Sequence, residues 1–451
     1  MAGQARAEAV GAPGSPGGTG DAPEVHPTIR AAFDALDRTG AAWALVRGAD
    51  ELRRPSGDVD VLVDPAALPV LDAGLRAAGL TRLPAAGHGS HRFYHRYDSA
   101  EDLWLKLDVV TEVAFGTYQE LRTDLAAGAL ARRHLQGGLQ RLAPQDEAWL
   151  YLLHQLLDKG TIAPSRVEPA AAAARVAGTD GPAAALVDRH GGPGSADRLL
   201  AAVGAGRVEE AVRLGGELRA GWARELGLRL PARTLGSRAA RRLPAPRRAD
   251  RLPGSLVAVL GPDGAGKTTL SDALTAQVPL PTRYVYMGMW QETRWDPYVR
   301  RVPGGRLGRL LLRVVRSVGE ARWHRARGRL VVVDRFVYDA LLAAPGSSLG
   351  DRVANAAMLR LGPSPDVLLL LDAPGELMFR RKGEHSPEVL EERRQAYLAL
   401  RDRLPGMVVL DAGAPADEVR RRALAVVWER VEALAAPPPG GPARSGGRRR
   451  R

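Results

Sequence analysis

The segment Leu256-Val-Ala-Val-Leu-Gly-Pro-Asp-Gly-Ala-Gly-Lys-Thr-Thr269 decides the fold of the second half of this chain. An apolar run of strand length leads into the spacing Gly-x-x-x-x-Gly-Lys-Thr, which ends at Thr268, and a helical pattern begins at Leu270. Glycines adopt positive φ readily, so such a loop can point several backbone N–H groups at one phosphate, and the following helix N-terminus adds a partial positive charge. The order of strand, glycine loop and helix therefore predicts a phosphate-binding loop.

The side chains of this loop predict the cofactors. Lys267 is expected to reach the β- and γ-phosphates, and the Thr268 hydroxyl is expected to ligate Mg²⁺. We therefore predict ATP and Mg²⁺ as cofactors. The residues expected to contact the nucleotide are Gly261, Asp263, Gly264, Ala265, Gly266, Lys267, Thr268 and Thr269.

Length and composition exclude several classes of protein. The 451 residues are enough for two or three domains with cores of their own. The chain has no cysteine, which rules out disulfides, thiolate zinc sites and cysteine nucleophiles. No apolar run approaches the length of a membrane span, and no secretory signal is visible at the N-terminus. We expect a cytoplasmic protein that does not bind membranes.

The net charge of +13 raises the question of nucleic-acid binding. Arginine is concentrated among prolines in Arg229–Arg251 and again in the tail Arg448–Arg451. No aromatic residues are interleaved with these arginines, so there is no pattern for stacking on bases. We predict a solvated basic linker and tail, with a nucleic-acid arm as the alternative.

Composition and periodicity divide the chain into segments. The expected order is a disordered region at 1–24, an α+β domain at 25–142, a helical region at 143–230, a Pro- and Arg-rich linker at 231–253, an α/β domain at 254–434 and a disordered basic tail at 435–451. In the α/β domain, short apolar strands alternate with helices, which predicts a five-stranded, parallel, doubly wound sheet. The predicted strands are Leu256–Leu260, Arg283–Met287, Leu330–Val333, Val367–Leu371 and Met407–Leu410.

Two further motifs of the α/β domain carry chemistry. Asp334 and Arg335 follow a buried strand, where the acid can hold Mg²⁺ or the acceptor and the arginine can clamp a phosphate. The basic run Arg380–Glu384 precedes a new helix and suits a lid that closes over the transferred phosphoryl group. Of this run we select Arg381 as catalytic. A basic helix end is the alternative for any single arginine there.

Together these residues resemble the thymidylate kinase-like family of P-loop kinases, over about residues 254–432. Asp263–Thr269 matches the family's phosphate loop, Asp334-Arg335-Phe336 matches its Asp-Arg-aromatic motif, and Arg380–Glu384 lies where the family has its lid. The resemblance implies transfer of the γ-phosphoryl group of ATP to a nucleoside monophosphate or a similar small acceptor. It places the kinase chemistry on Lys267, Asp334, Arg335 and Arg381.

The chain departs from this family at three places. Members usually carry Glu two residues before the Asp-Gly-type core of the loop, where this chain has Gly261-Pro262. A Thr-Arg-Glu-Pro-Gly-type segment is replaced by Tyr284–Trp290. The Ser-x-x-Ala-Tyr-Gln-type segment that reads the thymine base is missing from Val337–Leu349. ATP use is therefore implied, and the identity of the acceptor is left open.

In the N-terminal domain, three carboxylates follow a pattern that suits metal-dependent chemistry. Asp58 and Asp60 are two residues apart, so they point to the same face of a strand, and Asp108 lies on a later strand. Three acids converging from neighbouring strands can hold two Mg²⁺ ions around a triphosphate. This pattern resembles the polymerase-β-like nucleotidyltransferases over about residues 28–115, although Ala49 stands where that family has serine. The alternative is that Asp58 and Asp60 face solvent on an edge strand.

The sequence thus predicts a nucleotidyltransferase-like domain followed by a kinase that acts on a small-molecule acceptor, with a homodimer left open. Three other readings remain. The kinase can serve a sugar or a cell-envelope precursor, or the N-terminal domain can be the sole enzyme with the P-loop as a nucleotide sensor. The third reading is a nucleic-acid-binding module with arginine arms.

Overall fold

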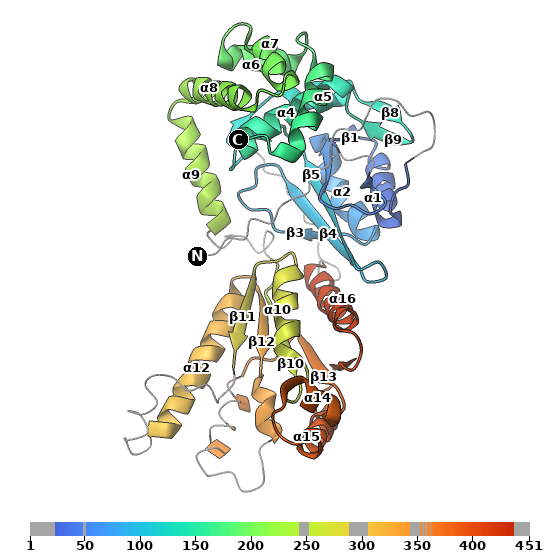
Figure 1. Cartoon of the computed structure of the whole chain (residues 1–451), viewed down its shortest axis with the longest axis vertical. Helices are drawn as coiled ribbons and strands as arrows, with labels where there is room; N and C mark the ends of the chain where they lie inside the picture. The colour runs from blue at the N-terminus through green and yellow to red at the C-terminus, as the bar shows by residue number, and fades with distance from the viewer. Residues whose placement is uncertain are drawn as a thin grey trace. The chain divides into compact units, whose positions relative to one another are not determined.

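The computed structural model describes residues 23–47, 51–242, 252–287, 305–342, 352–353, 356, 359–360 and 362–436. These residues form two compact units, each built around its own β-sheet (Figure 1). The termini that we predict to be disordered, 1–24 and 435–451, lie almost wholly outside the described residues.

The second unit contains five parallel strands in the order β11-β12-β10-β13-β14. This confirms the predicted α/β class with a parallel sheet. All five predicted strands are present, each within one residue of its expected bounds, because runs of apolar residues bounded by polar turns leave little choice of position. The strands are β10 (Ser255–Leu260), β11 (Thr282–Tyr286), β12 (Leu330–Asp334), β13 (Val367–Asp372) and β14 (Met407–Asp411).

Helices cover both faces of this sheet. Alternate residues of β10, β12 and β13 pack with side chains of α12 and α15 in one hydrophobic core. Val257 and Val259 point to the other face of β10 and are also fully buried, and α10 and α16, which take no part in the first core, contact the strands as well (Figure 1). The described helices of this unit include α10 (Lys267–Gln277), α12 (Gly305–Ala326), η6 (Val337–Leu342), α14 (Gly375–Lys382), α15 (Pro387–Ala399), η7 (Leu400–Asp402) and α16 (Ala416–Ala435).

The first unit is an α+β fold around a mixed seven-stranded sheet in the order β3-β4-β5-β2-β1-β9-β8. Strand β2 pairs in parallel with β5 and antiparallel with β1. The sequence predicts strands at Trp43–Val46, Val59–Val63, Arg92–Tyr97 and Leu103–Val110, and the structure contains all four. The additional strands have only two or three residues, too few for periodicity to reveal. The strands are β1 (Trp43–Leu45), β2 (Val59–Val63), β3 (Thr81–Leu83), β4 (Arg92–Asp98), β5 (Leu103–Val110), β8 (His134–Gln136) and β9 (Leu139–Arg141), with the separate pair β6 (Ala114–Phe115) and β7 (Leu121–Arg122).

Helices make up the rest of the first unit, as expected for residues 143–230. The periodicity of Glu147–Leu157 predicts a helix there, and the chain is α-helical to Leu153 before it forms a π-helix, η3 (His154–Lys159). The described helices are α1 (Pro27–Asp37), η2 (Pro65–Ala67), α2 (Leu68–Ala77), α3 (Leu125–Ala131), α4 (Pro144–Leu153), η4 (Pro164–Arg166), α5 (Val167–Ala177), α6 (Pro182–Gly191), α7 (Ser195–Gly204), α8 (Val208–Leu226) and α9 (Arg229–Arg242).

The predicted linker, 231–253, contains most of helix α9. Arg241 of this helix donates a hydrogen bond to the carbonyl oxygen of Gly87 at 3.0 Å, and its guanidinium lies over the ring of Tyr118. The first part of the Arg-rich stretch is therefore a helix packed on the first unit.

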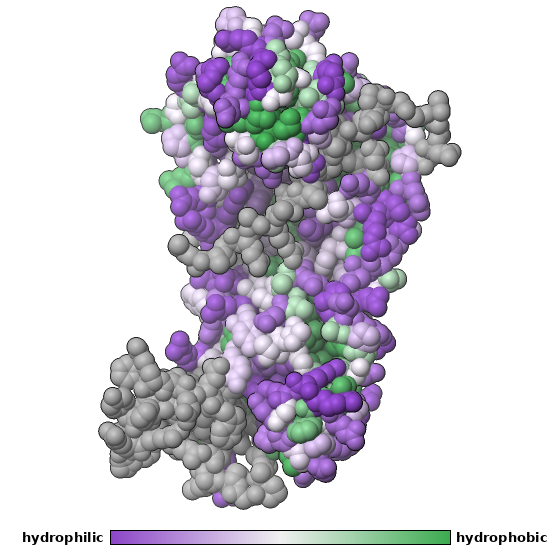
Figure 2. Space-filling view, in the orientation of Figure 1, coloured by the Kyte–Doolittle hydropathy of each residue, from purple (hydrophilic) through white to green (hydrophobic). Residues whose placement is uncertain are grey.

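The surface of the described residues is mainly polar (Figure 2). Hydrophilic residues cover most of the described surface in the view of Figure 2, and hydrophobic residues form separate patches between them. Among the described residues, none of the helices combines the length and the apolar character that crossing a membrane requires.

Candidate functional site

The phosphate-binding loop connects the end of β10 to the start of α10, as predicted. Gly261, Gly264 and Gly266 have φ values of 143°, 86° and 98°, which L side chains rarely adopt. A Cβ atom would lie 2.9 Å from the carbonyl oxygen of Leu371 at Gly261, and 2.5 Å from that of Met378 at Gly264. A Cβ at Gly266 would meet no described atom within 4 Å beyond its own chain neighbours. The loop therefore packs on β13 and α14 and leaves Gly266 open to a ligand.

Lys267 is the first residue of α10 and is only 8% exposed. Its Nζ donates a hydrogen bond to the carbonyl oxygen of Pro262 at 2.8 Å and lies 3.8 Å from a carboxylate oxygen of Asp263. Burial lowers the pKa of the Lys267 amine, and the negative charge of Asp263 opposes this effect. The amine is thus held over the loop, in position to meet an anion.

Asp334 lies at the end of β12, beside the phosphate loop, and is 2% exposed. Its Oδ2 accepts hydrogen bonds from the Thr268 hydroxyl at 3.0 Å and from the Tyr284 hydroxyl at 3.2 Å. Its Oδ1 is buried and has no hydrogen-bond partner among the described residues. A buried carboxylate oxygen without a partner, next to a hydroxyl, fits a Mg²⁺ ion.

Four cations surround the carboxylate of Asp263. Besides Lys267, it pairs with the Arg335 guanidinium, lies 3.9 Å from Lys382 Nζ and lies 3.6 Å from Arg393 Nη1. Burial alone would raise the pKa of Asp263, but the four positive charges outweigh burial and hold this pKa below its usual value. This cluster gathers cations from α10, the end of β12, α14 and α15 at the phosphate loop.

The predicted catalytic arginines differ in their positions. Arg335 lies in the cluster around Asp263 and adopts φ of 58°, a conformation that non-glycine residues take mainly where the surroundings enforce it. Arg381 lies elsewhere: its Nη1 donates a hydrogen bond to the carbonyl oxygen of Ala412 at 2.9 Å. The structure brings Lys382 of the predicted lid, and not Arg381, to Asp263. The catalytic role of Arg381 stays a prediction.

Asp339 and Tyr397 lie close to the predicted residues of the site and were not predicted from the sequence. Asp339 lies on η6, five residues after Asp334, and its carboxylate accepts a hydrogen bond from the Tyr397 hydroxyl of α15 at 2.9 Å. It is close enough to Lys267 and Arg335 for both charges to affect its pKa. An acid soon after the Asp-Arg pair was a signal for Asp339, whereas nothing local to α15 pointed to Tyr397.

Comparison with curated proteins finds thymidylate kinases. The thymidylate kinase of Xanthomonas campestris pv. campestris (strain B100) is 37% identical over 199 residues, which cover 40% of this chain and 85% of that protein. That of Xylella fastidiosa (strain 9a5c) is 31% identical over 203 residues, which cover 39% of this chain and 90% of that protein. Through this part, the chain belongs to the thymidylate kinase family.

The likeness to thymidylate kinases does not extend over the whole chain. The first unit has no named homologue among the proteins compared. A comparison of the chain with profiles of known protein families finds no match.

In the first unit, the three predicted carboxylates line one cavity of about 420 Å³. Asp60 of β2 lies directly opposite Asp108 of β5 in the register of these parallel strands, and Asp58 immediately precedes β2. The cavity is lined by Arg47, Glu51, Leu52, Pro55, Ser56, Gly57, Asp58, Val59, Asp60, His88, His91, Phe93, His95, Lys106, Asp108, Gln119 and His154.

Each of these carboxylates lies beside a basic side chain. The distances are 2.6 Å between Arg47 Nη2 and Asp60 Oδ2, 2.8 Å between His91 Nδ1 and Asp108 Oδ2, and 3.6 Å between Lys106 Nζ and Asp58 Oδ1. Burial raises the pKa of Asp60 and of Asp108, and repulsion from the neighbouring carboxylates acts in the same direction. The cavity thus concentrates charges of both signs.

The predicted metal site is not formed in this arrangement. Within the described part of the chain, no three His, Cys, Asp or Glu side chains are placed as a metal ion would need. Arg47 and Lys106 are ion-paired with two of the three carboxylates, so both cations would have to move before Mg²⁺ could bind there. The metal-ligand role of Asp58, Asp60 and Asp108 stays a prediction.

Four of the nine histidines line this cavity: His88, His91, His95 and His154. Burial lowers the pKa of His95 to about 3, and its Nδ1 has no hydrogen-bond partner in the described residues. The sequence analysis missed these side chains. The recurrence of three histidines within eight residues of the chain was the signal for them.

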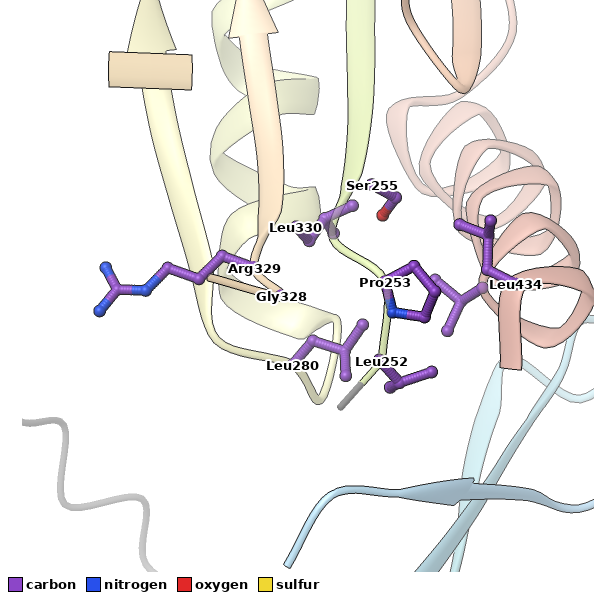
Figure 3. Close-up of a pocket in the computed structure, with 9 residues that line it drawn as sticks. Leu252, Pro253, Ser255, Leu280, Gly328, Arg329, Leu330 and Leu434 are labelled. Carbon is purple, nitrogen blue, oxygen red and sulfur yellow. The ribbon is translucent and has the colours of Figure 1, made fainter. Parts of the chain in front are cut away.

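A second pocket, drawn in Figure 3, lies where β10 and β12 begin, at the opposite end of these strands from the phosphate loop. Leu252, Pro253, Ser255, Leu280 and Leu434 are among the side chains that surround it. Its space of about 10 Å³ barely holds one water molecule. This pocket is a packing gap.

The loop geometry predicts the effect of one added methyl group. Gly264→Ala should lose about 1–3 kcal/mol of stability to the positive φ alone, with a further loss from the contact with the Met378 carbonyl. It should also weaken ATP binding, as measured by calorimetric titration alongside thermal melting. Gly319→Ala is the matched control, because a Cβ there has free space within helix α12. Equal behaviour of the two variants would show that the loop does not constrain nucleotide binding.

Proposed function

We propose that the second unit is a phosphotransferase that uses ATP and Mg²⁺ and acts on a nucleoside monophosphate or a similar small acceptor. This proposal rests mainly on three features that meet at the phosphate loop. They are the buried Lys267, the hydrogen bond between Thr268 and Asp334, and the cations around Asp263. Phosphoryl transfer needs positioning and positive charge around the γ-phosphate, and these groups supply both. Membership of the thymidylate kinase family supports the same class of reaction.

In this proposal each side chain has a defined task. Lys267 exchanges its contacts with Pro262 and Asp263 for the terminal phosphates of the nucleotide. Thr268 and Asp334 hold Mg²⁺, which, when bound, neutralises charge on the β- and γ-phosphates. Arg335 and Lys382 remain beside the loop to stabilise charge that develops on the transferred group.

The first test separates the two units. Lys267→Ala should lower ATP consumption at least 10²-fold, because the phosphates lose a buried positive charge. ADP release with a panel of nucleoside monophosphates, nucleosides and sugars measures this effect. The double variant Asp58→Ala with Asp60→Ala should keep ADP release unchanged. The reverse result, with Lys267→Ala active and the double variant inactive, would assign the activity to the first unit.

The second test concerns the lid. Lys382→Ala and Arg393→Ala should each lower kcat about tenfold or more, since each removes a charge that faces Asp263. Arg381→Ala is the comparison, because its guanidinium binds the Ala412 carbonyl. A loss of kcat only in Arg381→Ala would restore that arginine to the catalytic role that the sequence predicts.

We propose as a second function that the first unit is a nucleotidyltransferase-like site. The supporting observation is that Asp60 and Asp108 oppose each other on parallel strands and share a cavity with Asp58. The cavity of about 420 Å³ lies within the usual size range for small-molecule sites.

A transfer assay tests this second function in the absence of kinase activity. Lys267→Ala protein, given Mg²⁺, a panel of small acceptors and nucleoside triphosphates labelled at the α-phosphate, should transfer the labelled nucleotidyl group to an acceptor and release pyrophosphate. The further change Asp60→Asn should lower the rate at least 10²-fold, because it removes one negative charge from the expected metal site. Pyrophosphate release that is indifferent to Asp60 would rule out a role for the carboxylates.

A further inference from the structure

Three neighbouring strands of the first unit present one face to the cavity of about 420 Å³. These strands are β4, β5 and β2, in that order across the sheet. On β4, Phe93 and His95 are two residues apart and both line the cavity. Tyr94 lies between them in the chain, so it points to the opposite face, where it donates a hydrogen bond to Asp72. The cavity therefore has an aromatic end on β4 and an acidic end on β2.

Four side chains form the aromatic end, which we call the aromatic wall: His88, His91, Phe93 and His95. The ring centroid of Phe93 lies 5.3 Å from that of His88 and 5.7 Å from that of His91. Phe93 is only half-buried in spite of these neighbours. His95 is more than nine-tenths buried, and its Nδ1 has no hydrogen-bond partner among the described residues. An accessible ring next to a buried, unpartnered nitrogen fits a ligand that is flat and has a polar edge.

Two imidazoles of the aromatic wall are uncharged at neutral pH. Burial and the positive charges of Arg241 and His91 lower the pKa of His88 to about 4. Burial and the charge of Lys106 lower the pKa of His95 to about 3. An uncharged imidazole offers a ring face, one N–H donor and one acceptor nitrogen. The wall is therefore suited to a neutral heterocycle and not to an anion.

The other end of the same face is charged. Arg47 Nη2 lies 2.6 Å from Asp60 Oδ2 of β2, and Lys106 Nζ of β5 lies 3.6 Å from Asp58 Oδ1. A triphosphate with Mg²⁺ supplies a cation for the acids and anionic oxygens for Arg47 and Lys106, so both ion pairs can exchange partners. Because neighbouring strands lie about 4.8 Å apart, β4 and β2 are separated by about 10 Å. A nucleotide spans such a distance from its base to its phosphates.

We propose that the aromatic wall binds the base of a nucleoside triphosphate whose phosphates lie at the charged end of the cavity. This inference rests on the proposed nucleotidyltransferase-like function and adds the place where the nucleotide is recognised. The base stacks on the ring of Phe93, and a polar group on its edge forms a hydrogen bond with His95 Nδ1.

Binding to the full chain with Lys267→Ala tests this proposal, because that change weakens nucleotide binding at the phosphate loop. The probes are the α,β-methylene analogues of ATP, GTP, CTP and UTP, which resist nucleotidyl transfer, and inorganic tripolyphosphate, each titrated calorimetrically with Mg²⁺. At least one analogue should bind about 5- to 150-fold more tightly than tripolyphosphate, which is the usual contribution of stacking a base on an aromatic ring. Equal affinity of all the probes, or binding of none, overturns the inference.

Variants of Phe93 assign this difference to the aromatic wall. Phe93→Leu and Phe93→Tyr are a matched pair, because leucine fills the space without a ring and tyrosine keeps the ring. In the Lys267→Ala chain, Phe93→Leu should remove most of the advantage of the analogue over tripolyphosphate and leave the affinity for tripolyphosphate unchanged. Phe93→Tyr should keep the advantage.

Thermal melting checks that each variant is folded. His88→Leu, in the loop before β4, is a second variant that should act in the same direction as Phe93→Leu. An advantage that folded Phe93→Leu and His88→Leu chains both keep overturns the inference. An equal loss of affinity for tripolyphosphate overturns it too, because the ring would then only support the fold.

The failures of the two proposals are distinguishable. Nucleotidyl transfer that depends on Asp60 and not on Phe93 would refute only the binding of the base at the aromatic wall. Nucleotide binding that depends on Phe93, without any transfer, would refute the nucleotidyltransferase-like function and leave the wall as a nucleotide-binding site.

Discussion

The second unit depends on the burial of strand β10 between β12 and β13. All six of its residues are buried, and its register with both neighbours fixes where the strand ends. The glycine loop starts at that end and leads into α10, so the packing of β10 in the core of the sheet fixes the position of the loop. The same pairing puts Asp334, at the end of β12, beside Thr268. Apolar packing of the strands thus determines the place of the loop and of Asp334.

The two units use buried carboxylates in opposite ways. Around Asp263 the cations outnumber the acid, so its pKa falls and the surroundings stay attractive to a further anion. In the cavity of the first unit, burial and, to a smaller extent, repulsion between the acids raise the pKa values of Asp60 and Asp108 despite Arg47 and His91. The cluster around Asp263 can therefore attract phosphate oxygens without a metal ion. In the cavity of the first unit, a metal ion or a cationic group would stabilise the ionised acids.

Most of what periodicity controls could be predicted from the sequence. The parallel strands and the glycine loop follow from apolar runs and from the loop's motif, and the sequence also predicted that Asp60 and Asp108 lie on neighbouring strands. Side chains brought in by tertiary packing could not be predicted. Tyr397 comes from a helix about sixty residues after Asp334. His154 lies in a π-helix, which the helical periodicity of the sequence does not distinguish from an α-helix. Arg381 and Lys382 are neighbours on α14, and only the docking of that helix decides which one faces Asp263.

The parallel sheet of the second unit also governs how this chain acquires its structure during synthesis. Strand β10 leaves the ribosome about seventy residues before its partner β12 and more than a hundred before β13. Until then its apolar side chains have no sheet to join, and contacts between such distant segments form slowly. During synthesis the apolar strand β10 therefore stays unpaired and prone to aggregate until β12 and β13 have been made. We expect this order of the strands to increase the need for chaperones.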